Sequence, residues 1–267
     1  MPAPVLPGAE PFSHEGGRGA VLVLHGFTGN PQSMRFLAEG LAAAGFAVEL
    51  PLLPGHGTSI DDLVPKRWAD WSAAAEDALE ELASRHGNVV VAGLSMGGTL
   101  ACWLAERHGE IAGIAVVNPL VDPPAESFRA ILEGALAAGT VIAPGVGSDI
   151  AKPGVTELSY DGAPIEAALS LFEGVDAVAA GLERITCPVL LMTSREDHVV
   201  PSSSGDRLAA AVTGDVERVW LEHSYHVATL DNDAQEILER VAAFADGLND
   251  QVSDRQGPGS RTARGMA

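Results

Sequence analysis

The stretch VVVAGLSMGGTLA, residues 89–101, sets Ser95 between two apolar runs, with glycines on both sides. A Gly-x-Ser-x-Gly pattern alone arises by chance in a glycine-rich chain, so its surroundings must decide its meaning. Here a buried strand is predicted to end just before Ser95 and a helix to begin just after it, which is the setting of a nucleophile elbow. A serine on so sharp a turn needs a positive φ, and the glycines give the turn room. We predict that Ser95 is a nucleophile; the alternative is an incidental serine in a tight turn.

The predicted elbow also supplies a donor for developing negative charge. It exposes the serine Oγ at the N-terminus of a helix, where the backbone N–H of Met96 and the helix dipole face any oxyanion that forms. A serine hydroxyl is a weak nucleophile at neutral pH, so this chemistry needs a base and a group that orients the base. After an elbow of this kind the expected chain order is serine, acid, histidine.

Two carboxylates follow a predicted strand at residues 188–194. Glu196 and Asp197 lie in the sequence REDHVVP, directly after that strand, where the loop belongs to the carboxyl edge of the sheet. Asp197 is the better acid because its short side chain can hold an imidazole rigidly, although both residue types serve in this role. His198 is adjacent to Asp197 and is poorly placed to form a hydrogen bond with it while reaching a distant serine.

The base must come from one of eight histidines. The sequence LEHSYHVATLDND follows the last predicted strand and precedes the last predicted helix, so His223 and His226 both lie in the expected loop. The spacing of residues alone leaves both open.

The elements that must position these residues follow from the apolar pattern. Strands are predicted at 20–24, 46–50, 88–93, 111–118, 188–194 and 216–222, and most are apolar throughout, as strands buried on both faces are. Helical patterns lie between them, at 30–45, 66–87, 99–109, 202–214 and 233–247. Strands that alternate with helices predict an α/β fold with a mostly parallel sheet flanked by helices.

One interval breaks this alternation. Residues 120–186 contain Ala-rich helical pieces but no strong strand, and the interval is too long for a simple crossover. We predict a lid over the carboxyl edge of the sheet; the alternative is a set of irregular helices without a special role. Residues 1–119 and 187–248 then form the core, and the polar, glycine-rich residues 249–267 form a disordered tail.

Charge and hydropathy exclude several classes of protein. The chain has 36 acidic against 16 basic residues, a formal net charge of −20, which repels phosphate backbones, so no nucleic-acid partner is expected. No stretch reaches the ~20 apolar residues of an integral membrane segment, and the N-terminus lacks the pattern of a signal peptide, so we expect a cytoplasmic protein. Cys102 and Cys187 have no metal-ligand spacing, and Cys102 is expected to be a buried thiol.

Five motifs together resemble the α/β-hydrolase superfamily, in its bacterial monoacylglycerol lipase and carboxylesterase branch. They are HGFTG, PGHGTSIDDL, GLSMGG, EDHVVP and SYHVATLD, and the resemblance covers about residues 20–246. It implies His226 as the base and Asp197 as the acid, with the backbone N–H of Phe27 as the second oxyanion donor. Many lipases carry HGGG where this chain has HGFTG. The resemblance also implies a small helical cap inserted before the strand that carries the acid, at residues 120–186.

The resemblance further implies the substrate. It suggests a serine hydrolase that cleaves monoacylglycerols to glycerol and free fatty acid without a metal or cofactor, with a small-molecule ester as its partner and a monomer or homodimer as its state. The stretch VGSDIAKPGVTELSY, residues 146–160, resembles the part of the cap that contacts substrate, through Val146 and Glu157. The alternatives are a broad short- to medium-chain carboxylesterase and a non-catalytic ligand-binding module. Dehalogenation is disfavoured because its nucleophile is an aspartate where this chain has Ser95.

Overall fold

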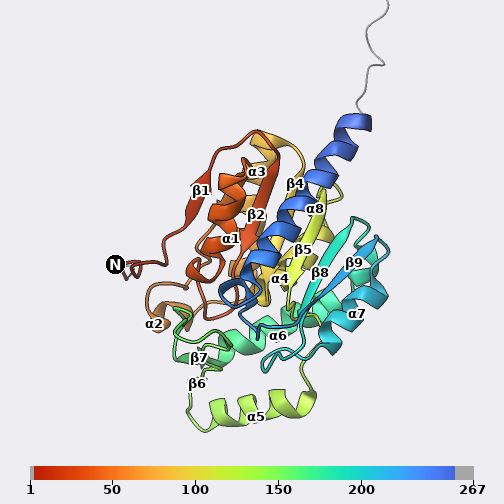
Figure 1. Ribbon diagram of the computed structural model, residues 1–267. Coiled ribbons are helices and arrows are strands. Elements are labelled where there is room, and N and C mark those ends of the chain that lie inside the picture. Colours follow the sequence, from red (N-terminus) through yellow and green to blue (C-terminus); the bar gives the residue numbers. More distant parts are fainter. Residues whose placement is uncertain (1–2, 256–267) are drawn as a thin grey trace, which may run out of the picture.

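The predicted apolar runs form neighbouring strands of one sheet in the computed structural model, which describes residues 3–255 (Figure 1). The seven strands lie in the order β1-β3-β2-β4-β5-β8-β9, and all neighbours are parallel except β1 and β3. Their bounds are β1 Phe12–His14, β2 Ala20–Leu24, β3 Ala47–Leu50, β4 Val89–Leu94, β5 Gly113–Val117, β8 Val189–Ser194 and β9 Val216–Leu221. The predicted α/β fold with a mostly parallel sheet is confirmed.

Helices cover both faces of this sheet and enclose two apolar cores. On one face lie α1 (Gln32–Ala43) and α8 (Ala234–Arg255), and on the other lie α3 (Trp68–His86), α4 (Met96–Ala105) and α7 (Ser203–Ala211). The central strands β2, β4, β5 and β8 are buried along their whole length, as their unbroken apolar sequences require. Cys102 is a free, buried thiol in α4, as expected.

The segment between β5 and β8 lies at the carboxyl edge of the sheet. It contains α5 (Glu126–Ala137), β6 (Ile142–Pro144), β7 (Gly162–Pro164), α6 (Ile165–Ala179) and the 3₁₀ turn η1 (Leu182–Arg184). Helix α6 packs on α3 and α4 and joins their apolar core, whereas α5 has no buried residue and lies farthest from the sheet (Figure 1). The sequence predicted only helical pieces here; the small β6–β7 sheet and the long loop 145–161 are additional.

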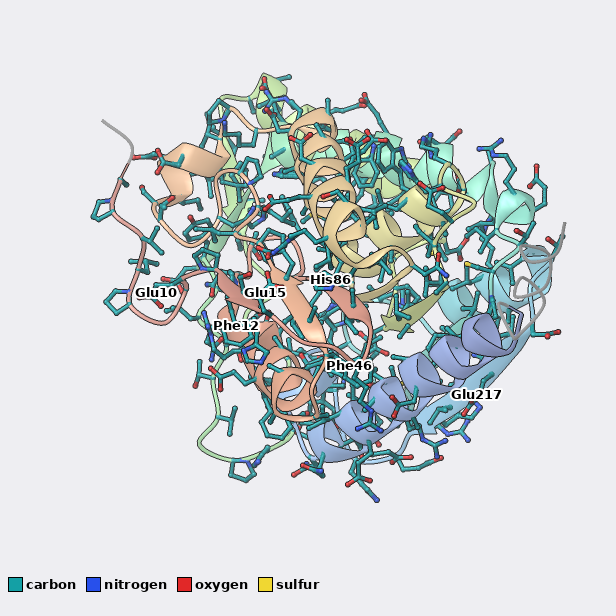
Figure 2. The ribbon with its side chains drawn as sticks, turned by 90° about the horizontal axis from the view of Figure 1, so that it is seen from above. Glu10, Phe12, Glu15, Phe46, His86 and Glu217 are labelled. Carbon is teal, nitrogen blue, oxygen red and sulfur yellow. The ribbon has the colours of Figure 1, made fainter. Side chains whose placement is uncertain are left out.

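Two further elements were not predicted because they carry no apolar run. Strand β1 is a short antiparallel edge strand with two exposed residues, and α2 (Ile60–Leu63) is a single turn. Near β1, Glu15 approaches His86 at the end of α3, with 3.3 Å between Oε2 and Nε2 (Figure 2). A second 3₁₀ turn, η2 (Ala228–Leu230), precedes α8.

The C-terminal helix is longer than its sequence pattern suggests. The predicted tail began at residue 249, but α8 continues to Arg255. The remainder of the predicted tail, residues 256–267, lies outside the described residues. None of the helices within residues 3–255 is both long and apolar enough to cross a membrane.

Candidate active site

Ser95 occupies the turn between β4 and α4 with φ 56° and ψ −117°. This backbone conformation is costly for a residue with a side chain, so it persists only where its surroundings hold it. The Ser95 N–H donates to the carbonyl of Val117 on the neighbouring strand β5, at 3.0 Å. The elbow geometry predicted from the sequence is therefore confirmed, and the strain lies at the residue predicted to do chemistry.

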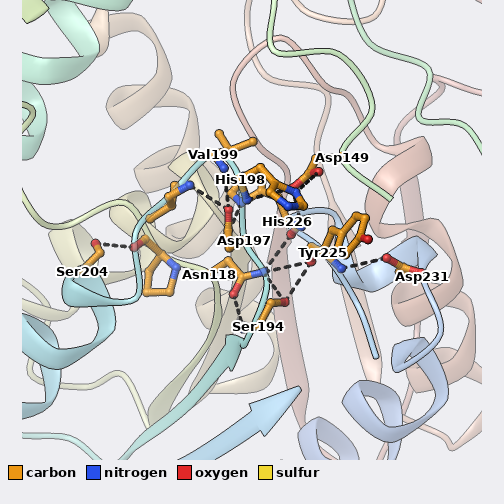
Figure 3. Close-up of polar contacts among 12 residues, drawn as sticks. Asn118, Asp149, Ser194, Asp197, His198, Val199, Ser204, Tyr225, His226 and Asp231 are labelled. Carbon is orange, nitrogen blue, oxygen red and sulfur yellow. Dashed lines mark hydrogen bonds and ion pairs between the residues drawn. The ribbon is translucent and has the colours of Figure 1, made fainter. Parts of the chain in front are cut away.

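Asp197 and His226 come together from the loops after β8 and β9. The Nδ1 of His226 lies 2.8 Å from Oδ2 of Asp197, and the two side chains are only 8% and 3% exposed (Figure 3). The other oxygen of Asp197 accepts the backbone N–H groups of Val199 and Val200, at 2.8 and 2.7 Å, which fixes the carboxylate. With its proton on Nδ1, the imidazole keeps Nε2 as an acceptor.

The rejected alternatives lie elsewhere. The side chain of His223 is exposed, and the backbone N–H of this residue donates to Asp233 at 2.9 Å. Glu196 is exposed as well. The imidazole of His198 is 59% exposed and bonds to Asp149 rather than to Asp197, with 2.7 Å between Nδ1 and Oδ1. The structure thus brings only one histidine of these loops against the predicted acid.

The HGFTG loop lies directly against the elbow. A Cβ built on Gly26 would lie 3.5 Å from the Cβ of Ser95, so the amide of the next residue, Phe27, is close to the serine. Thr28 holds a positive φ of 63°, a second strained position beside the site. The N–H of Met96 is the first in helix α4, where no carbonyl of the helix can accept it. Both predicted oxyanion donors therefore belong to backbone adjoining Ser95.

Two buried histidines support this loop. The Nδ1–H of His25 donates to the carbonyl of Gly26 at 3.0 Å, and its Nε2 accepts the N–H of Leu53 at 3.2 Å. His56 packs edge-on against His25 and Phe27, at ring-centroid distances of 5.0 and 6.2 Å. Burial lowers the pKa of His25 to about 4, and burial together with the neighbouring His25 lowers the pKa of His56 well below its usual value. Both rings are neutral at physiological pH.

A cavity of about 940 Å³ lies between the carboxyl edge of the sheet and the segment 120–186. Ser95, His226 and Phe27 all line it. Its remaining wall is mostly apolar and comes from α5, α6 and the loops around them. Phe128, Ile131, Leu132, Ala135, Ala168, Leu171 and Phe172 are among its residues. The predicted contact Val146 also lines it but is 71% exposed, which places this residue at the mouth.

Glu157 contributes a carboxylate to the wall of this cavity. Its Oε1 lies so close to Gly29 that a Cβ there would come within 2.7 Å of it, so the acid extends over the HGFTG loop. Burial raises the pKa of Glu157, while the charge of His226 and hydrogen bonds with Ser33 and Ser159 oppose that rise. A carboxylate in this position can accept hydrogen bonds from hydroxyl groups near the serine.

Asn118 supports the site, and the sequence did not single it out. The side chain of Asn118 donates to Ser194 Oγ at 2.9 Å and to the carbonyl of His226 at 2.8 Å, and thereby ties β5, β8 and the histidine loop together (Figure 3). Its position directly after a buried strand was the available signal.

Among residues 3–255 no group of three His, Cys, Asp or Glu side chains is arranged to hold a metal ion.

Comparisons with known proteins agree with this architecture. The family model Hydrolase_4, described as serine aminopeptidase, S33, matches residues 16–233. The chain is 44% identical to the thermostable monoacylglycerol lipase of Bacillus sp. strain H-257 over 244 residues, which cover 90% of this chain and 96% of the relative. It is 28% identical to a carboxylesterase of Bacillus subtilis strain 168 over 243 residues, covering 90% and 97% of the two chains.

Solved structures show the same fold. A structure from work on LipS and LipT, two metagenome-derived lipolytic enzymes, is 44% identical with a TM-score of 0.87, covering 91% of this chain and all of that one. The crystal structure of Paleococcus ferrophilus monoacylglycerol lipase, at 21% identity, has a TM-score of 0.74 over 90% of this chain and 99% of that one. With its elbow, its acid–histidine pair and a family match across most of its length, the chain belongs to the serine aminopeptidase S33 (Hydrolase_4) family of α/β-hydrolases.

Proposed function

We propose that Ser95, His226 and Asp197 form a catalytic triad and that the protein hydrolyses carboxylic esters through an acyl-enzyme. One observation carries this proposal: a strained serine lines the same apolar cavity as His226, whose imidazole is paired with the buried carboxylate of Asp197. A non-catalytic binding module would not need a nucleophile at a positive φ beside an oriented base.

The steps follow from the positions of these groups. The Nε2 of His226 takes the proton of Ser95 Oγ as that oxygen attacks the ester carbonyl. The amides of Phe27 and Met96 donate to the oxyanion, and each such donor contributes roughly 10²–10³ in rate. Asp197 holds the imidazole and stabilises the imidazolium. The same imidazolium then protonates the departing alcohol, and His226 next activates a water that releases the acid.

The cavity favours a substrate with one long apolar part and one small polar part. Apolar residues of α5 and α6 fit an acyl chain, and Glu157 beside the HGFTG loop fits the hydroxyl groups of an alcohol. Glycerol has two free hydroxyls in a monoacylglycerol, so we assign monoacylglycerols as the substrate, with Val146 at the entrance. The 44% identical relative carries the name monoacylglycerol lipase, which supports this assignment.

A broad short- to medium-chain carboxylesterase is the second candidate, favoured by the similarity to the carboxylesterase of Bacillus subtilis. A panel of p-nitrophenyl esters and 1-monoacylglycerols of increasing chain length separates the two, with di- and triacylglycerols as controls. A monoacylglycerol lipase gives its highest kcat/KM on medium- or long-chain monoacylglycerols and little activity on triacylglycerols. A preference for butyrate esters with no gain from a glycerol group contradicts the assignment.

The cytoplasmic location and the monomeric or dimeric state stay predictions. Light scattering of the purified protein tests the second, and a stable assembly larger than a dimer contradicts it.

A further inference from the structure

The side chain of Asp149 connects the inserted segment to both loops of the proposed acid–base pair. Asp149 lies in the loop between β6 and β7, far in sequence from either loop. Its Oδ2 accepts the backbone N–H of His226 at 3.0 Å and that of His198 at 3.2 Å (Figure 3). Its Oδ1 accepts Nδ1–H of His198 at 2.7 Å. One carboxylate therefore bonds to the base itself and to the residue that follows the acid.

The backbone around His226 is fixed from two further directions. The backbone carbonyl of Asp149 accepts the N–H of Val227, at 3.0 Å. On the other side, the N–H of Tyr225 donates to Asp231 at 2.9 Å. Three consecutive amides are thus held by Asp149 and Asp231, and only Asp149 also reaches the loop of the acid.

Asp231 attaches the inserted segment to the same place. Its two oxygens accept the backbone N–H groups of Ala151 and Lys152, at 2.7 and 2.8 Å. The chain around Asp149 is therefore anchored to the histidine loop, whereas helix α5 of the same segment has no buried residue. This anchoring lets a carboxylate from the inserted segment act as a fixed part of the site.

The Asp149 side chain is only 13% exposed. Burial opposes its charged form, but hydrogen bonds from His198 and His226 outweigh burial and lower the pKa of the carboxyl. The group is therefore an ionised acceptor at neutral pH, and hydrogen bonds to an ionised acceptor are stronger than those between neutral groups.

We propose that Asp149 is a positioning residue that holds His226 in place relative to Asp197 and Ser95. The inference rests on the proposed function, in which His226 is the base. The imidazole projects from a backbone whose amide Asp149 holds, so loss of this carboxylate lets the ring shift. A shift of about 1 Å between reacting groups costs on the order of 10² in rate. The effect falls on the chemical step, because Asp149 does not line the cavity.

Kinetics of Asp149 variants on a p-nitrophenyl ester test this assignment. Asp149→Ala is expected to lower kcat about 10- to 100-fold at nearly unchanged KM. The rate of inactivation by a fluorophosphonate, which needs the serine and its base but little substrate binding, is expected to fall by a similar factor. Asp149→Asn keeps an oxygen for the two backbone donors and is expected to recover most of kcat.

Two control variants separate positioning from general effects. Asp161→Ala removes an exposed carboxylate from the same loop. His198→Ala removes the imidazole but keeps both backbone donors to Asp149. The kcat of each variant is expected to stay within about threefold of wild type. Wild-type kcat in Asp149→Ala, no recovery in Asp149→Asn, or an equal loss in His198→Ala overturns the assignment. If the alanine variant does not fold, Asp149→Glu replaces it. The kcat of Asp149→Glu is expected to fall about tenfold, and a wild-type kcat overturns the assignment.

Ser95→Ala in the same assay keeps the two proposals distinguishable. Activity of Ser95→Ala refutes the proposed function whatever the Asp149 variants do. An inactive Ser95→Ala beside Asp149 variants at wild-type rates refutes only the positioning role.

Discussion

The first turn of helix α4 passes so close to the end of strand β2 that a Cβ built on Gly97 would lie 2.1 Å from the carbonyl oxygen of Leu24. It would also lie 2.9 Å from the carbonyl oxygen of His25. Both contacts are with backbone, which cannot rotate away as a side chain can. The glycine after the elbow is therefore what allows Ser95 and the HGFTG loop to lie together.

Gly97→Ala is expected to lower the free energy of unfolding by at least about 2 kcal/mol, because the added methyl overlaps fixed backbone. Esterase activity is expected to fall as well, because the two backbone segments that carry the proposed oxyanion donors are pushed apart. Urea unfolding and kcat measure both effects. Gly109→Ala is the matched control, since a Cβ there meets nothing within 4 Å. Equal stability of the two variants contradicts the close approach.

The pairing of His226 with Asp197 predicts unequal effects for the two histidines of the loop. His226→Ala is expected to lower kcat about as much as Ser95→Ala does, because members of a triad act as a unit. His223→Ala changes kcat less than about threefold, since its side chain is exposed. Steady-state kinetics of both variants decide the matter, and the reverse ranking moves the base to His223.

The sequence was sufficient for the elbow and the sheet because both depend on local signals. The unbroken apolar runs mark buried parallel strands, and the glycines beside Ser95 mark a turn that only small neighbours permit. The loop that is proposed to carry the base also followed from chain order. Chain order did not decide between His223 and His226. Both lie in one loop, and they differ only in which of them reaches Asp197.

The supporting residues could not be predicted because they act across long sequence separations. Asp149 meets His226 through a loop whose path depends on the small β6–β7 sheet, and those strands are only three residues long. The edge strand β1 was missed for the same reason. The side chain of Asn118 bonds to strand β8 and to the histidine loop. Its position directly after a buried strand was a signal for the residue, but not for these two distant partners.

Glu157 is expected to recognise the alcohol part of a monoacylglycerol. Glu157→Ala should lower kcat/KM for monoacylglycerols by about 1.5–3 kcal/mol in transition-state free energy, as for lost hydrogen bonds to a charged group. Activity on p-nitrophenyl esters, which lack those hydroxyls, should hardly change. Parallel assays on the two substrates provide the test. Equal losses of kcat/KM on both substrates mean that Glu157 supports the structure of the inserted segment. No loss on either substrate means that Glu157 does not belong to the site.

The buried neutral histidines predict loss of stability in acid. Their folded pKa values lie below the unfolded value of 6.5, so the unfolded state binds protons first as pH falls. Stability is full above about pH 6.5 and declines below it; the contribution of His25, about 3 kcal/mol, is lost by about pH 4.

His56→Phe keeps the aromatic packing and removes one of these titrations. Urea unfolding between pH 7 and pH 4 is expected to show a shallower decline than in wild type. His14→Ala is the control, because His14 is exposed and its loss leaves the decline unchanged. An identical decline of stability in His56→Phe and wild type means that the His56 ring does not contribute to the loss of stability in acid.

The strained serine of the elbow is proposed to be the nucleophile. The most direct measurement is the rate of p-nitrophenyl ester hydrolysis by Ser95→Ala, with circular dichroism and the melting temperature showing that the variant is folded. The substitution removes the hydroxyl that is proposed to form the acyl-enzyme, so kcat is expected to fall by at least about 10³. A folded Ser95→Ala whose kcat stays within tenfold of wild type shows that Ser95 is not the nucleophile.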